Sequence, residues 1–513
     1  MAKRKNGRKG SKFFRVFSLL FSILLILITA LLIIQLIRLN VLPIFFVLPI
    51  SIILVTITLL FVIFLVFKSK KGLSRFIFSI LVLILSFVYS VGNYYLFETN
   101  KAFDSVTNLT TKITNTLSVR VMNDTISDEQ QLSGKTLGYF SSMDVDDLSR
   151  LSSALQSDGI EYSSISYDDI FEMVDDLYNG YIDGILFNES FSGVITSDET
   201  YSMFVNRTTP VYSTTYYTDN EKNIEDSLDD VSVDSEPFTI LISGNDSYGQ
   251  FSENSRSDMN MLVTVNPKTA TVLMTSIPRD YYVPIAELTD GYSDQELYDK
   301  LTHSGLYGVQ TTEKTIENFL NTEINYYVRV NFSSLINLVD AIGGVDVYVE
   351  PGLAVDAFYA DTTLGGVNEG WNHLNGKQAL AFSRERHAYI DGDNQRVRNQ
   401  QIVLKALISS LTKPTMLLNY PNFVSALSGA FETNMPAASI SKLLKFEFGN
   451  FPKWQFESTS LIGYDGNDFC ASLGTYAYVL VPDELSIQTT HDKIEAVRQG
   501  GSSNDVEERN VEG

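Results

Sequence analysis

Three long apolar runs occupy the first 97 residues and constrain the fold more than any other feature of the sequence. They cover residues 16–37, 41–67 and 76–97, and no Asp or Glu precedes Glu98. Each run approaches or exceeds the roughly 20 residues that cross the hydrocarbon core of a bilayer as a helix. The first run is too long for a cleaved signal peptide and leads directly into the second. The sequence therefore predicts a membrane anchor of three transmembrane helices over residues 1–97.

The basic residues of the anchor predict its orientation. Seven Lys and Arg residues precede the first run, and four more separate the second run from the third, whereas Arg38 alone lies in the other connection. Basic clusters stay on the cytoplasmic side of a membrane. We therefore expect a multi-pass protein of the cell membrane with a cytoplasmic N-terminus and an extracytoplasmic body after Phe97.

The charge of that body excludes several classes of protein. Of the 38 basic residues, twelve lie within residues 1–75, which leaves 26 against all 61 acidic residues. Such an excess of negative charge disfavours binding to nucleic acid phosphates. A single cysteine, Cys470, excludes an intramolecular disulfide, and four scattered histidines without an HExxH pair disfavour a zinc enzyme.

Hydrophobic periodicity divides the body into two α/β units. Residues 98–118 read as a polar stalk, 119–219 as a small α/β accessory domain, and 220–236 as an acidic linker. Strands and helices alternate in residues 237–484, which predicts an α/β/α layered domain with a mixed sheet. The polar residues 485–513 are expected to be a disordered tail.

Charged residues gather in the second unit where apolar strands end or helices begin. The sequence places Asp246 and Asp258 beside such strands, and arginines in the segments SRSD, PRD, SRER and NQRVRNQQ. Arginine suits multidentate binding of phosphate, and two aspartates could hold a magnesium ion. Any one of these pairs is more simply explained as a surface salt bridge. Their joint placement at strand ends favours a ligand site.

At these residues the sequence resembles the LytR-CpsA-Psr (LCP) family of Gram-positive cell envelopes. The resemblance covers residues 237–404, and its markers are FTILISGND, SRSDMNMLVTVNPKT, SIPRDYYVPI, VNFSSLINLVDAIGGVDVYV, LNGKQALAFSRER and DNQRVRNQQ. Three spans and an accessory domain are similar to the capsule-assembly members of the family. Two departures stand out: Asn399 replaces an arginine that often precedes the Gln pair, and residues 304–308 replace a Gly-Gly pair.

The resemblance implies a phosphotransferase. It would move a capsule-type or other anionic glycopolymer from a polyprenyl diphosphate carrier to a sugar hydroxyl of peptidoglycan, forming a phosphodiester. Asp246 and Asp258 would hold Mg²⁺. The general base stays open, with Asp258 favoured if the metal does not fully engage it. The diphosphate clamp would comprise Arg279, Arg384, Arg386 and Arg396, with Gln400 as a further donor and Arg256 and Asp280 as the next members. Arg279, Asp258, Arg384 and Arg386 are the expected catalytic residues.

Other aspects of the expected site follow from helical spacing and from the chemistry of the donor. Arg396 and Gln400 share one face of a helix that opens near Asp393, whereas Arg398 points elsewhere. The lipid tail would lie in an apolar slot lined by the helix of residues 330–339 and neighbouring strands. Expected partners are membrane lipid and capsule-synthesis membrane proteins, and no nucleic acid.

Two other functions use the same residues. The chain could be a non-enzymatic regulator that binds a lipid diphosphate and controls capsule synthesis. It could also be a magnesium-dependent polyprenyl diphosphate hydrolase, in which water replaces the sugar hydroxyl. Two carboxylates beside the arginines favour an enzyme over a regulator. A transcription factor is the least favoured reading, because the body is acidic and lies outside the membrane.

Overall fold

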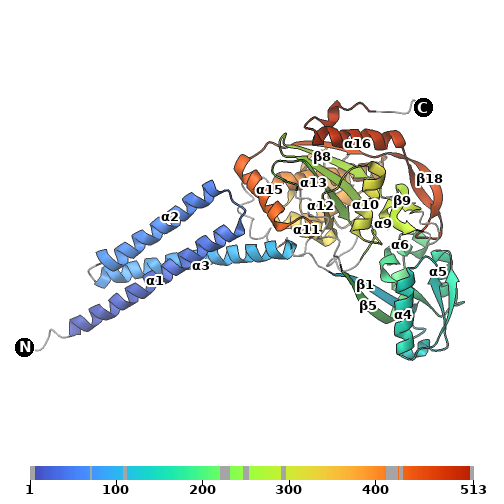
Figure 1. Cartoon of the computed structure of the whole chain (residues 1–513), viewed down its shortest axis with the longest axis horizontal. Helices are drawn as coiled ribbons and strands as arrows, with labels where there is room; N and C mark the ends of the chain where they lie inside the picture. Colours follow the sequence, from blue (N-terminus) through green and yellow to red (C-terminus); the bar gives the residue numbers. More distant parts are fainter. Residues whose placement is uncertain are drawn as a thin grey trace, which may run out of the picture. The chain divides into compact units, whose positions relative to one another are not determined.

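The computed structural model describes residues 6–69, 72–107, 112–219, 231–245, 254–289, 296–411, 426 and 431–508. The chain forms two compact units (Figure 1). The first contains the N-terminal helices together with a helix from residues 436–452, and the second contains the accessory domain and the sheet domain. The predicted acidic linker of residues 220–236 lies largely outside the described residues.

The first unit confirms the three apolar helices. They are α1 (Asn6–Leu39), α2 (Ile44–Ile63), which continues into the π-helical turn η1 (Phe64–Lys68), and α3 (Gly72–Thr107). Among the described residues, three stretches are long and apolar enough to span a membrane: Val16–Leu39, Ile44–Lys68 and Leu73–Lys101. The third helix therefore continues into the predicted stalk.

Polar side chains hold the three helices in register. The hydroxyls of Thr29 and Thr58 lie 2.8 Å apart, and Asn93 Nδ2 donates to the Ile28 carbonyl at 3.1 Å. Helix α15 (Ala437–Asn450) belongs to the same unit, where Lys445 Nζ donates to Asn40 Oδ1 at 2.6 Å. These hydrogen bonds fix which helices of the anchor pack together. Apolar surfaces alone would not, because lipid tails are as apolar as the helices.

The accessory domain is a mixed α/β unit. Its five-stranded sheet has the order β3-β2-β4-β1-β5. The strands are β1 (Lys112–Met122), β2 (Thr136–Phe140), β3 (Ser163–Tyr167), β4 (Gly184–Asn188) and β5 (Thr208–Asp219). The helices are η2 (Glu129–Leu132), α4 (Val145–Ser157), α5 (Ile170–Asn179), η3 (Glu189–Phe191), α6 (Ser192–Thr196), η4 (Glu199–Tyr201) and α7 (Phe204–Arg207). Because β1 pairs with β5 from Lys112 onward, residues 112–118 of the predicted stalk belong to a strand of this domain.

The second domain is built on a six-stranded mixed sheet of order β16-β11-β6-β7-β8-β17. Its strands are β6 (Phe238–Gly244), β7 (Met259–Asn266), β8 (Thr271–Ile277), β11 (Tyr326–Val330), β16 (Phe431–Thr433) and β17 (Gln455–Ser460). The apolar runs predicted as strands thus form the centre of the sheet. Residues of β7 and β8 are almost all buried, as expected for strands that are covered on both faces.

Helices cover both faces of this sheet. Leu273 and Ile277 pack with α10 (Val309–Leu320) and α16 (Glu484–Arg498). On the opposite face, Ser276 accepts a hydrogen bond from Gln401 of α13 (Asp393–Leu411). Since neighbouring strand residues point to opposite faces, the α/β/α layering predicted from the sequence is confirmed.

Further elements surround the sheet. They are α9 (Leu301–Ser304), α11 (Phe332–Ala341), α12 (Gly376–Arg384) and the 3₁₀ turn η6 (Ser503–Asp505). Four two-stranded sheets join β9 (Tyr282–Thr289) to β10 (Glu296–Lys300), β12 (Val345–Val349) to β15 (Gly370–Leu374), β13 (Val355–Ala357) to β14 (Gly365–Val367), and β18 (Gly463–Cys470) to β19 (Thr475–Pro482).

The prediction of a disordered tail is wrong for residues 485–508, which the structure describes. Helix α16 covers residues 485–498, and the side chains of Ile494 and Val497 are fully buried against the sheet. The N-cap Asp483 accepts hydrogen bonds from the backbone of Leu485 and Ser486. Few apolar residues suffice here, because burying two or three of them on one stripe anchors a short helix to an existing core.

Candidate active site

The antiparallel register of two strands brings the first candidate residues together. Asn260 at the start of β7 lies opposite Ile277 at the end of β8. Asp258 therefore precedes one strand, and Arg279 follows the other, at the same edge of the sheet. Strand β6 also ends there, because Gly244 lies opposite Met259. Asp246 follows β6 in sequence but lies outside the described residues.

Asp258 is held by two arginines and a threonine. Arg256 Nη2 lies 3.2 Å from Asp258 Oδ2, and Arg279 Nη1 lies 3.2 Å from Oδ1. Thr302 Oγ1 donates to the same Oδ1 at 3.3 Å. The Asp258 side chain is only 13% exposed, so these contacts occur in a setting where screening by water is reduced.

A short segment around α9 connects the loops that carry these residues. The backbone of Ser257 donates to the Thr302 carbonyl at 2.9 Å, and the backbone of Thr302 donates to the Arg279 carbonyl at 2.8 Å. Gly305 makes this approach possible, since a Cβ there would lie 2.4 Å from the Ser255 carbonyl oxygen. The departure from the family pattern in residues 304–308 thus still supplies the one glycine that close packing requires.

Asp280 orients Arg279 from the other side. Arg279 Nε lies 3.4 Å from Asp280 Oδ2, and Lys300 Nζ lies 3.4 Å from Asp280 Oδ1. Burial alone would raise the pKa of Asp280, but the charges of Arg279 and Lys300 outweigh it and lower the pKa below its ordinary value. Burial likewise opposes the charge of Arg279, yet Asp280, Asp258 and Asp393 raise its pKa. Both groups are therefore ionised at neutral pH.

Helix α13 adds a second group of charges. Arg396 Nη2 lies 2.8 Å from Asp393 Oδ2, and Arg386 Nη1 lies 3.8 Å from Asp393 Oδ1. The pKa of Arg396 is lowered, first by burial and then by the neighbouring charges of Arg279 and Arg386, although Asp393 opposes the shift. The positive charges of other arginines disfavour the charged form of Arg396. An anion bound at this position would relieve that repulsion.

The ion pairs leave an excess of positive charge. Within the described residues, five cations contact three carboxylates: Arg256, Arg279, Lys300, Arg386 and Arg396 surround Asp258, Asp280 and Asp393. Among these eight residues the cations outnumber the carboxylates, which favours the binding of an anion. We call these eight residues the arginine cluster.

The structure places the other predicted clamp residues at the margin of this cluster. Arg384 ends α12, and its guanidinium stacks on the Phe332 ring, 4.2 Å from the ring centroid. Phe332 follows β11, whose last residue Val330 pairs with Gly244 at the same sheet edge. Gln400 is half-buried on α13, one helical turn after Arg396 as predicted.

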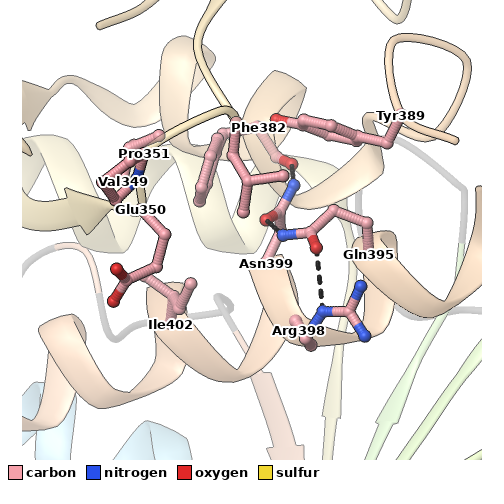
Figure 2. A pocket seen from close by; sticks show the side chains of 10 residues that line it. Val349, Glu350, Pro351, Phe382, Tyr389, Gln395, Arg398, Asn399 and Ile402 are labelled. Atoms are coloured by element: carbon pink, nitrogen blue, oxygen red, sulfur yellow. Dashed lines mark hydrogen bonds between the residues drawn. The ribbon is translucent and has the colours of Figure 1, made fainter. Parts of the chain in front are cut away.

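Arg398 points to a different neighbourhood. Its Nε donates to Gln395 Oε1 at 2.8 Å, and its guanidinium pairs with Asp391. Figure 2 shows the side chains of Arg398 and Gln395 at the edge of a cavity. The volume of this cavity is about 370 Å³. Asn399, in the place of the family arginine, is fully buried there and donates to the Phe382 carbonyl at 3.0 Å.

The cavity is mainly apolar. Val349, Pro351, Leu353, Phe382 and Ile402 form its wall, with Glu350, Tyr389, Gln395, Arg398 and Asn399 supplying polar groups. These residues come from the end of β12 and the segment after it, from α12 and α13, and from the connection between these two helices. The helix of residues 330–339, which the sequence predicted to line a lipid slot, contributes no residue to this cavity.

Comparison with known proteins assigns the domain to a family. The model of the LytR_cpsA_psr family matches residues 201–494, which is more than half of the chain. The chain belongs to the LytR_cpsA_psr family. The matched range includes the whole arginine cluster and ends within α16.

Several LytR_cpsA_psr relatives have known names or structures. A polyisoprenyl-teichoic acid–peptidoglycan teichoic acid transferase TagU of Bacillus anthracis is 34% identical over 253 residues, spanning 49% of this chain and 77% of the relative. A relative of the same name from Enterococcus faecalis is 30% identical over 232 residues, spanning 44% and 72%. The crystal structure of B. subtilis TagV matches with 28% identity and a TM-score of 0.43, covering 52% of this chain and 99% of that one. The structure titled TagT bound to LI-WTA matches with 29% identity and a TM-score of 0.42, covering 53% and 94%.

Two members of the arginine cluster in this LytR_cpsA_psr domain, Lys300 and Asp393, and a neighbour of the cluster, Thr302, were missed by sequence reasoning. Lys300 and Thr302 lie in an unremarkable stretch of sequence and reach the cluster only through the fold. Asp393 was predicted to begin the helix of Arg396 but not to contact arginines. Its spacing of three residues from Arg396, on one helix face, is the signal that could have identified it.

The carboxylate oxygens of Asp258 are of the type that binds a magnesium ion. Magnesium takes hard oxygen ligands and often binds through one or two carboxylates and substrate phosphates. Asp258 supplies such a carboxylate beside the arginines, and Asp246 is the second candidate. No group of three or more His, Cys, Asp or Glu side chains able to hold a metal occurs within the described residues. A magnesium ion here would complete its coordination with water and with oxygen atoms of the substrate.

Proposed function

We propose that this chain is a glycopolymer phosphotransferase that acts outside the cell membrane. It transfers an anionic glycopolymer from a polyprenyl diphosphate carrier to a sugar hydroxyl of peptidoglycan. The observation that carries the proposal is the arginine cluster, in which Arg279 and Asp258, and Arg396 and Asp393, form ion pairs and the charges of Arg279 and Arg386 lower the pKa of Arg396.

The cluster supports binding of the diphosphate. Each arginine is already oriented by a carboxylate, so little side-chain freedom is lost when phosphate oxygens bind. Arg279 is fixed between Asp258 and Asp280, and Arg396 is fixed by Asp393. The planar fork of each guanidinium offers two parallel hydrogen bonds to a phosphate.

The reaction exchanges one phosphorus–oxygen bond for another. The acceptor hydroxyl oxygen attacks the sugar-proximal phosphorus, and the bond from that phosphorus to the bridging oxygen breaks. Polyprenyl phosphate leaves with the electron pair of that bond, and the acceptor proton passes to a base. Since the donor diphosphate already stores the required energy, the enzyme needs only to position the reactants and stabilise charge on the phosphoryl oxygens.

Asp258 is the proposed base and magnesium ligand. Its carboxylate lies among the groups that would hold the phosphorus, at 3.2 Å from both Arg256 and Arg279. A magnesium ion bound by Asp258 and Asp246 would neutralise charge on the diphosphate. The arginines would provide the same kind of stabilisation.

The membrane anchor and the apolar cavity suit a lipid-linked donor. The three apolar helices are long enough to hold the protein at a bilayer, and the basic clusters of the sequence favour an extracytoplasmic sheet domain. The cavity beside α12 and α13 offers an apolar wall to part of an isoprenoid chain. Lipid-linked glycopolymer, peptidoglycan and membrane lipid are thus the proposed partners, together with capsule-synthesis membrane proteins.

The class of polymer follows from both the resemblance and the relatives. The relatives are named as transferases of teichoic acid, an anionic glycopolymer. The accessory domain and the three spans resemble the capsule-assembly members. We therefore propose a capsule-type or teichoic-acid-type polymer as the transferred group.

One experiment tests the proposal. The full chain in nanodiscs is incubated with a polyprenyl diphosphate oligosaccharide, peptidoglycan fragments and Mg²⁺, and the products are analysed by mass spectrometry. We expect a phosphodiester-linked product and free polyprenyl phosphate. Release of polyprenyl phosphate with a free phosphorylated oligosaccharide would indicate a hydrolase. Binding without any product would indicate a regulator.

A further inference from the structure

The hairpin of β18 and β19 has two different sides. Val479 and Cys470 are fully buried on one side, where they pack into a core shared with residues of the accessory domain such as Phe140 and Val194. The alternate positions point outward, and three of them are aromatic: Phe469, Tyr476 and Tyr478 are 47%, 67% and 51% exposed. Contact between large aromatic side chains and water is unfavourable, and a contiguous group of them on a surface is typical of a binding site.

These outward residues form one surface, which we call the aromatic face. Phe469 pairs with Tyr476 across the hairpin, and their rings lie 5.9 Å apart in an edge-to-face arrangement. Tyr478 follows Tyr476 at about 7 Å along the same side of β19, as strand geometry requires. Asn467 lies opposite Tyr478, and the Tyr478 hydroxyl donates to Asp465 Oδ1 at 2.7 Å.

The aromatic face is continuous with the arginine cluster. The backbone of Leu480, two residues after Tyr478, donates to the Asp280 carbonyl at 2.7 Å. Lys300 Nζ lies 6.0 Å from the centroid of the Tyr478 ring and 3.4 Å from Asp280 Oδ1. The hairpin is therefore fixed to the segment that carries Arg279, with Tyr478 near the cluster and Phe469 and Tyr476 farther along.

The charges of the aromatic face indicate what it would bind. Its carboxyl group is that of Asp465, and Lys300, the cation beside the Tyr478 ring, is paired with Asp280. A polyanionic donor polymer would meet like charge there. An uncharged sugar chain would instead find ring faces for its C–H groups and amide, carboxylate and hydroxyl groups for its hydroxyls.

We propose that the aromatic face binds the glycan strand of the acceptor and leads its sugar hydroxyl toward the arginine cluster. The occupant is an uncharged chain of N-acetylated hexosamines. This inference rests on the proposed transferase function for its biological meaning, but glycan binding is measurable without transfer. Phe469, Tyr476 and Tyr478 would position the substrate and would not take part in the chemistry.

Binding of chitohexaose, an uncharged N-acetylglucosamine oligomer, tests the proposal. The probe is titrated into the full chain in nanodiscs by isothermal calorimetry, for the wild type and for Phe469→Ala, Tyr478→Ala and Tyr478→Phe. Loss of one stacking ring is expected to raise Kd about tenfold for either Ala variant. Tyr478→Phe keeps the ring and should bind within about threefold of the wild type.

A matched control is available on another two-stranded sheet. Trp371 is 74% exposed and contacts Tyr348 edge-to-face at 5.5 Å, on the sheet of β12 and β15. Trp371→Ala should leave the Kd for chitohexaose unchanged. Thermal unfolding of each variant shows whether the fold is retained.

The transfer reaction supplies a second readout. Tyr478→Ala should raise KM for peptidoglycan fragments, with KM for the lipid donor and kcat at saturating acceptor unchanged. The proposal is overturned if the wild type does not bind chitohexaose, or if Trp371→Ala weakens binding as much as Tyr478→Ala. It is also overturned if Tyr478→Ala instead weakens binding of poly(glycerol phosphate) or dissociates a dimer. Glycan binding at the hairpin without any transfer would contradict the proposed function while supporting this site.

Discussion

Arg279 Nη1 lies 3.2 Å from Asp258 Oδ1, although 20 residues separate the two in the chain. They meet because β7 begins and β8 ends at the same edge of the sheet. With Asp280 on its Nε, Arg279 is held in one orientation before any substrate binds. Because Arg279 is oriented before the substrate binds, we expect its replacement to reduce donor affinity directly.

Replacement of Arg279 should weaken donor binding. Arg279→Ala removes a charge-assisted hydrogen bond worth about 1.5–3 kcal/mol, so Kd for a polyprenyl diphosphate should rise about tenfold or more. Arg279→Lys should restore little of the loss, because one ammonium cannot reproduce a planar fork. Donor titration into the full chain measures both variants. Wild-type affinity in Arg279→Lys would show that charge alone matters.

Asp258→Asn should affect magnesium more than donor binding. The amide keeps the size of the side chain but is a much poorer ligand for a hard cation, so Mg²⁺ affinity should fall at least about tenfold and transfer should be almost abolished. Calorimetric titration of Mg²⁺ in the presence of donor is the measurement. Asp391→Asn is the control. Asp391 is exposed and pairs with Arg398, so this variant should behave like the wild type. A normal transfer rate in Asp258→Asn would remove Asp258 from the site.

Arg396 and Arg398 should differ although they are two residues apart on one helix. Arg396 contacts Asp393 within the arginine cluster, whereas Arg398 contacts Asp391 and Gln395. Arg396→Ala should lower kcat/KM for the donor about tenfold or more. Arg398→Ala should change it less than about threefold. Equal losses in the two variants would show that the substrate contacts the cavity side of α13.

The lowered pKa of Asp280 predicts a pH-dependent contribution to stability. A carboxyl group whose pKa is lower in the folded state stabilises the protein above its ordinary pKa of about 3.9, and this stabilisation is lost as the pH falls through the folded-state value. Asp280→Asn should therefore destabilise the chain by about 1.5–3 kcal/mol at pH 7. The difference from the wild type should narrow below about pH 4. Thermal unfolding in detergent from pH 7 to pH 3 tests this, and a difference independent of pH would contradict it.

The topology of the anchor can be tested separately. A reporter enzyme that is active only outside the cytoplasm, fused after Phe97, should be active, because both basic clusters are expected to stay inside. A fusion in the connection at Lys70 should be inactive. Activity at Lys70 and none after Phe97 would reverse the orientation and exclude peptidoglycan as a substrate.

The sequence by itself determined the membrane anchor and the class of the sheet domain. Runs of apolar residues long enough to cross a bilayer have few alternative structures, and the helices found in the structure match them. The alternation of apolar strands and periodic helices likewise predicted an α/β/α domain. Helix α13 and the shared face of Arg396 and Gln400 were also predictable, since both depend only on local spacing.

Tertiary structure decided which charges meet. Lys300 and Thr302 reach Asp280 and Asp258 because the segment around α9 hydrogen-bonds to both strand-end loops, a relation that no local pattern encodes. The order of the tail has the same origin: α16 has few apolar residues, and only an existing core makes their burial favourable. The aromatic face also depends on the fold, because strand alternation sorts side chains into two sets but only packing shows which set is buried.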